Sequence, residues 1–68
     1  MEKLVDSYMT VTWGMRGFFA VLIGKFEDEN GKVTMEPIQS SPFSFPKREE
    51  AVKDAIFWAE GEGVRVEV

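Results

Sequence analysis

The stretch Phe18–Phe26, which reads FFAVLIGKF, decides the fold because its first six residues are all apolar. Successive side chains of an extended strand point to opposite faces of a sheet. Both faces of this strand therefore need cover, whereas a sheet packed on one helix normally alternates apolar and polar residues. One face would carry Phe18, Ala20 and Leu22, and the other would carry Phe19, Val21 and Ile23.

The segment before this stretch predicts a partner strand over Ser7–Trp13. Polar and apolar side chains alternate there, and many of them belong to the β-branched and aromatic types that strands favour. Between the two strands lies Gly14-Met15-Arg16-Gly17, whose two glycines are free to take positive φ. We expect a tight reversal at these four residues.

The segment after the stretch predicts a second hairpin. Asn30-Gly31 separates two strand-like runs, and both residues tolerate the left-handed conformation that a type I′ turn demands. A third strand is expected over Lys32–Ile38. Pro37 cannot donate a hydrogen bond to a neighbouring strand, so this strand should lie at a sheet edge or end there.

Beyond a proline-containing loop over Ser40–Pro46, the periodicity changes to that of a helix over Lys47–Glu60. Gly61 is placed to end the last turn, and Val64–Val68 alternates as a short fourth strand. Acidic residues in the first turn would complement the helix dipole. The expected apolar stripe of the helix consists of Ala51, Val52, Ala55, Ile56 and Ala59.

These elements predict a single small α+β domain over residues 1–68, in the order β-β-β-α-β. It would be a three-stranded antiparallel meander with one helix packed on the sheet and a short C-terminal strand. A right-handed crossover would place the last strand beside the first, in the spatial order 4-1-2-3.

The composition disfavours several kinds of chemistry. The chain has 0 Cys and 0 His, the residues most used for nucleophilic catalysis, proton transfer near neutral pH and zinc ligation. Its carboxylates fall in turns and in the first turn of the helix, where solvation and the helix dipole explain them. We therefore expect no enzyme activity, no catalytic residue, no cofactor and no metal.

Charge and hydropathy limit the partners and the compartment. Net charge is -4, and the 8 basic residues are scattered along the chain, so nucleic-acid binding is disfavoured. The longest apolar run is Phe18–Ile23, far short of the roughly 20 residues that a membrane-spanning helix needs. The absence of cysteine and of an apolar segment near Met1 favours the cytoplasm.

The two-sided apolarity of the second strand suggests a function through contact. Its second face could be covered by the Ser40–Pro46 loop, by the N-terminal segment, or by another molecule. We expect a non-catalytic protein-interaction module that forms a homodimer or binds a protein partner. An antitoxin-like or phage-type inhibitor or regulator of another protein, and a small-ligand-binding domain, are the alternatives. The candidate interface residues are Phe18, Phe19, Val21, Phe57 and Trp58.

One family shows a similar order of elements. Gly17–Val21, followed by a hairpin and a helix that opens Arg48-Glu49-Glu50-Ala51, resembles the N-terminal domain of HicB-type antitoxins. That resemblance implies a small sheet-plus-helix module that binds a toxin. The chain departs from the family in having Ser41-Pro42-Phe43-Ser44-Phe45 where a Pro-Asp-Leu-Pro-Gly type of motif is expected before the helix. No site residue is carried over from this comparison.

Overall fold

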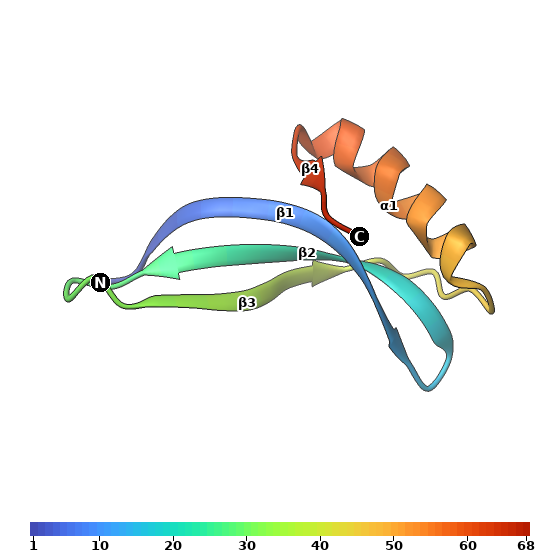
Figure 1. Ribbon diagram of the computed structural model, residues 1–68, viewed down its shortest axis with the longest axis horizontal. Coiled ribbons are helices and arrows are strands. Elements are labelled where there is room, and N and C mark those ends of the chain that lie inside the picture. Colours follow the sequence, from blue (N-terminus) through green and yellow to red (C-terminus); the bar gives the residue numbers. More distant parts are fainter.

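A computed structural model describes all residues from Met1 to Val68. The elements are β1 (Lys3–Gly14), β2 (Gly17–Glu27), β3 (Val33–Ser40), α1 (Arg48–Glu62) and β4 (Arg65–Val66). They form one four-stranded sheet in the order β3-β2-β1-β4, with α1 packed on it (Figure 1). The meander is antiparallel and β4 runs parallel to β1. The predicted β-β-β-α-β fold and strand order are confirmed.

The β1–β2 hairpin pairs from Lys3 with Glu27 to Gly14 with Gly17, with one register shift between Leu4 and Asp6. β1 begins four residues earlier than its alternation predicted, because β2 is long enough to pair with those residues too. The reversal at Gly14–Gly17 is confirmed. Gly17 has φ +116°, and a Cβ on it would lie 2.4 Å from the carbonyl oxygen of Phe45, so no other residue fits there without strain.

The second hairpin forms at the expected place but not with the expected turn. A type I′ turn needs positive φ at both central residues, and Asn30 has negative φ while Gly31 has φ +80°. The Gly31 amide donates to the carbonyl oxygen of Asp28 over 3.1 Å. The Asp28 carboxylate also accepts from the amides of Asn30 and Lys32, both at 2.9 Å. This side chain holds the backbone in a wider loop.

β3 is an edge strand, as Pro37 requires, but it continues through the proline to Ser40. The register with β2 shifts between Leu22 and Ile23, where Ile38 is the extra residue. This bulge lies next to the proline that cannot donate a ladder bond.

Helix α1 begins within one residue of the predicted start and ends two residues later than predicted. Gly61 lies inside the helix, so the prediction that it ends the last turn was wrong. Gly63 is the capping residue, with φ +71°, and its amide donates to the carbonyl oxygen of Ala59 over 2.8 Å. Two glycines stand two residues apart there, and sequence spacing could not choose between them.

The core between α1 and the sheet is small. Ala51, Ala55 and Ala59 are buried on the helix, whereas Ile56 is 44% exposed, so the apolar stripe is narrower than predicted. Only 8 of 68 residues are buried, and Met9 is the one large side chain that is fully buried. Alanine lets the helix approach the sheet closely but adds little apolar area.

The predicted last strand is also shorter than expected. β4 is confined to Arg65–Val66, although the Glu67 amide still donates to the carbonyl oxygen of Met9 over 2.8 Å.

α1, the single helix, lacks the length and apolar character that crossing a membrane requires.

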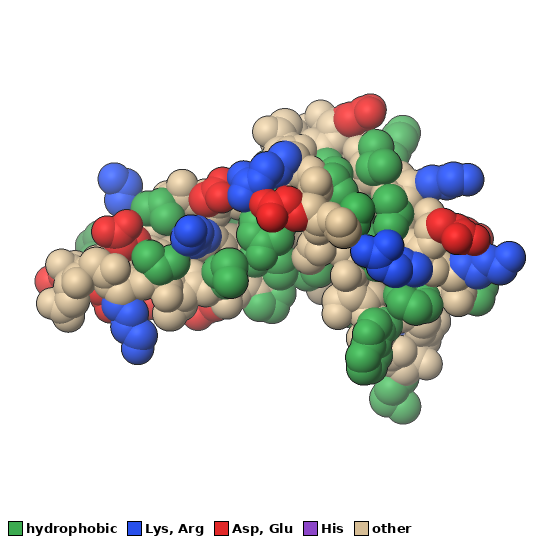
Figure 2. All heavy atoms as spheres, in the orientation of Figure 1, with side chains coloured by type: hydrophobic (Ala, Val, Ile, Leu, Met, Phe, Trp, Pro, Cys, Tyr) green, Lys and Arg blue, Asp and Glu red, His purple; other side chains and the backbone are tan.

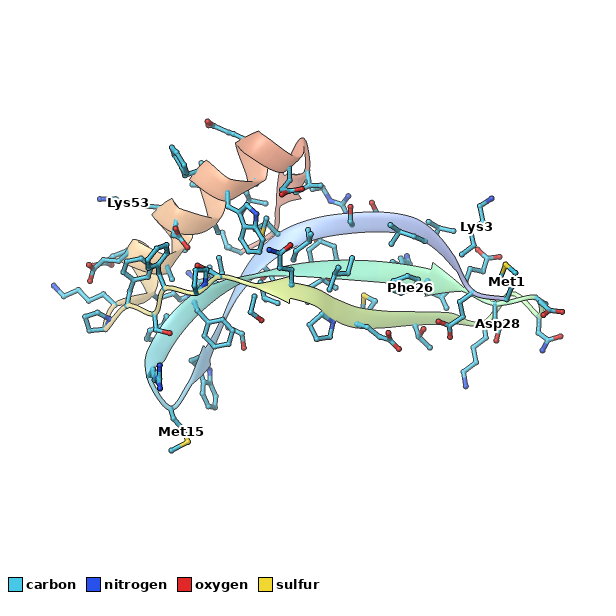
Figure 3. The ribbon with its side chains drawn as sticks, turned by 180° about the vertical axis from the view of Figure 1, so that it is seen from behind. Met1, Lys3, Met15, Phe26, Asp28 and Lys53 are labelled. Atoms are coloured by element: carbon cyan, nitrogen blue, oxygen red, sulfur yellow. The ribbon has the colours of Figure 1, made fainter.

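The molecule is elongated, with extents of 41 × 25 × 17 Å. Its radius of gyration is 12.9 Å, against about 11 Å for a compact chain of this length. Met15 marks one end of the sheet and Asp28 the other, with the helix over only part of the length between them (Figure 3). α1 packs on β1, β2 and β4 but not on β3. Much of the sheet therefore has no second layer.

Candidate functional site

One face of the sheet has no covering element. Met9, Ala20 and Leu22 pack with the helix alanines, which fixes the side of the sheet that faces α1. Directly paired residues share a face and neighbours along a strand alternate. The next residues of each strand therefore point away from the helix. We call this side the open face; across β2 and β1 its paired residues are Ile23 with Tyr8, Val21 with Thr10 and Phe19 with Thr12.

The open face has an apolar centre. Phe19 and Ile23 are half-buried, and Met35 and Pro37 on β3 extend the apolar area. Val21 is buried although no element covers it, because it is shorter than Phe19 and Ile23 on either side of it. The sheet bends along its length and α1 lies on the outer side of the bend, so the open face lies on the inner side (Figure 1).

A row of charged side chains borders the open face beside β4. The Arg65 guanidinium donates to both carboxylate oxygens of Asp6, at 2.9 and 2.7 Å, and to Glu67 at 2.5 Å. It also lies 5.3 Å from the centroid of the Tyr8 ring. The hydrogen bond from Arg65 lowers the pKa of Asp6 to about 2, and the bonds to Asp6 and Glu67 raise the pKa of Arg65. These contacts join β4 to β1 at the border of the open face.

The phenylalanines of the predicted loop do not cover the open face. Phe45 forms two backbone hydrogen bonds of 2.8 Å with Phe18, which extends the β2 edge past the end of β3. Phe43 lies on the helix side and is 63% exposed. Cover by the N-terminal segment is also absent, because that segment is β1 itself. Neither the phenylalanines of the loop nor the N-terminal segment therefore covers the open face.

The predicted interface residues lie in three places, and four of them belong to two surfaces, the open face and a groove beside α1. Phe19 and Val21 lie on the open face, whereas Phe18 shares the helix side of the sheet with its pair Trp13. Phe57 and Trp58 belong to a groove beside α1. Hydrophobic side chains accordingly appear in separate groups, along the sheet, beside the helix and at the hairpin tip (Figure 2).

The groove lies between α1 and the chain that leaves β3. It has a volume of about 360 Å³. Ser41 holds its two walls together: the Ser41 hydroxyl donates to the Asp54 carboxylate over 2.9 Å and accepts from the Phe43 amide over 3.2 Å. Its lining comprises Gln39, Ser40, Ser41, Pro42, Phe43, Asp54, Phe57, Trp58 and Gly61.

Sequence reasoning missed Phe43, Ser41 and Asp54 as parts of this surface. One available signal was the helical spacing of four of the lining residues. Phe57, Trp58 and Gly61 follow Asp54 by 3, 4 and 7 residues, so all four share one stripe of the helix. The partner wall carried no comparable signal, because Ser41 lies in the irregular segment before α1, 13 residues from Asp54 in the chain.

Comparison of the chain with protein-family models, with curated proteins and with solved structures finds no match. The element order that resembles HicB-type antitoxins is present in the fold, but no family match accompanies it.

Proposed function

We propose that the protein is a non-catalytic protein-interaction module that works as a homodimer, with the open face at the dimer interface. The observation that carries this proposal is the position of Phe19, Val21 and Ile23 on a side of the sheet where no element of the chain packs. Large aromatic residues near the centre of an apolar patch are the usual anchors of interfaces.

Surface area supports a second molecule on this face. A compact protein of 7.7 kDa exposes about 4300 Å², whereas this chain exposes 4971 Å². The excess of roughly 650 Å² is close to the ~800 Å² that each partner contributes to an interface of standard size.

Charge supports a second copy of the same chain as the occupant. The whole chain carries -4, which would repel a second copy approaching at random. The open face itself is balanced, because Lys25 and Arg65 offset Asp6 and Glu67. Two such faces can meet without net repulsion, and their apolar centres supply burial that so small a core lacks.

The test is sedimentation velocity from low to high micromolar concentration. We expect the parent to sediment as a dimer at the upper end and Phe19→Lys as a monomer with unchanged circular dichroism. Phe57→Lys is the matched control, since Phe57 is 78% exposed and lies on the helix side. It should remain a dimer.

A second variant guards against misfolding of Phe19→Lys. Thr12 is exposed and pairs with Phe19 on the open face, so Thr12→Lys leaves the core untouched and should also give a monomer. A parent that stays monomeric at high micromolar concentration would overturn the homodimer. Dimers that survive both lysines would move the interface away from the open face.

A further inference from the structure

The groove beside α1 combines aromatic surface with carboxylates that lack a cationic partner. The rings of Phe43 and Phe57 are 63% and 78% exposed, and Trp58 stands next to them. No lysine or arginine lines the groove, and Asp54 takes part in no ion pair of the structure. Exposed aromatic rings on a small surface are apolar area that a partner could bury.

Two further carboxylates lie close to the groove. Glu62 accepts a hydrogen bond of 3.3 Å from the Trp58 indole, and it too has no ion-pair partner. Glu50 precedes Asp54 by four residues and so lies on the same stripe of α1. Lys53, the basic residue next to Asp54 in the chain, projects from the helix away from the sheet (Figure 3).

We propose that this groove binds an arginine-bearing segment of a partner protein. A guanidinium is planar, stacks on aromatic rings and donates paired hydrogen bonds to a carboxylate. The groove offers both kinds of contact within one surface: the rings of Phe43 and Phe57, and the carboxylate of Asp54. The Ser41 hydroxyl occupies one oxygen of Asp54 and fixes the carboxylate in place.

This inference is independent of the proposed homodimer. The groove lies on the helix side of the sheet and the proposed interface lies on the open face. A dimer built through the open faces would leave both grooves accessible. Failure of one proposal therefore leaves the other standing, because oligomeric state and peptide binding are measured separately.

The test uses the fluorescence of Trp58. The chain has 2 Trp, so a Trp13→Phe background leaves Trp58 as the only tryptophan. The probe is a capped tri-arginine peptide, and the control peptide is capped tri-citrulline, which keeps the planar shape without the charge. We expect saturable binding of the arginine peptide and none of the citrulline peptide. Equal response to both peptides, or no response to either at millimolar concentration, would overturn the proposal.

A matched pair of variants separates a specific contact from general attraction. Asp54→Asn keeps an acceptor for Ser41 but removes the charge, and it should weaken binding about tenfold or more, since hydrogen bonds to charged groups contribute about 1.5–3 kcal/mol. Glu49→Gln removes the same charge from the exposed first turn of α1 and should change the affinity much less. Equal weakening by the two variants would show non-specific attraction of the peptide to an acidic helix, and it would refute the proposal that arginine binds in the groove.

Discussion

On the face of β2 beneath α1, Ala20 and Leu22 are buried, whereas on the opposite face Phe19 and Ile23 are only half-buried. Side chains at least as large as Ala20 and Leu22 thus lie on the uncovered face, on either side of the buried Val21, while Phe18 on the helix side is half-buried too. Small residues under the helix match the alanines of α1 and let two backbones approach closely, while phenylalanine and isoleucine offer area for which the chain has no second layer. Apolar side chains in this strand therefore close a small core on one face and provide an accessible surface on the other.

The largest expected effect comes from a pair of truncations, one on each face of the sheet. Met9→Ala removes the largest fully buried side chain and should cost about 2–5 kcal/mol. Total stability for a chain of this length is of the order of 3–10 kcal/mol, so this variant should lose a large share of its free energy of unfolding. Ile23→Ala on the open face should cost about 1–2 kcal/mol, because its side chain is already partly hydrated.

Urea denaturation followed by circular dichroism would measure both variants, at a concentration low enough to keep the protein monomeric. Equal losses would mean that the open face contributes as much to the fold as the covered face, and the division of roles would fail.

Much of this division could be predicted from local sequence pattern. Alternation along Phe18–Ile23 predicted two apolar faces, and the helix periodicity predicted a cover for one of them. Which face is covered could not be predicted, because that depends on contacts of Met9 with Leu22 and with α1 that are distant in sequence. The ion pair of Asp6 with Arg65 joins residues 59 positions apart in the chain, and no local periodicity of the sequence indicates this contact.

The second prediction tests how closely the covered face is packed. Ala55 is completely buried between α1 and the sheet, so Ala55→Leu should overpack this contact and cost about 1–3 kcal/mol. Ile56→Leu, one residue along and 44% exposed, is the control and should change stability by less than about 0.5 kcal/mol. Thermal melts of both variants provide the measurement. An Ala55→Leu protein as stable as the parent would show that the small-residue contact is loose.

The smallest expected effect concerns pH, and it separates the faces by charge. The buried side chains of the covered face do not titrate, whereas the open face carries Asp6, whose pKa the hydrogen bond from Arg65 lowers from 3.8 to about 2. The folded state therefore binds fewer protons at Asp6 than the unfolded chain does. The stabilisation is fully present above about pH 4 and is lost as pH falls through about 2.

Arg65→Gln should return the pKa of Asp6 towards 3.8 and reduce the acid dependence of stability, while Arg16→Gln on the β1–β2 turn should change neither. The Asp6 side-chain carbonyl shift, followed by NMR from pH 1.5 to 6, measures both. A titration of Asp6 unchanged by Arg65→Gln would mean that the charged row is not held by this pair, and the open face would lose its fixed polar border.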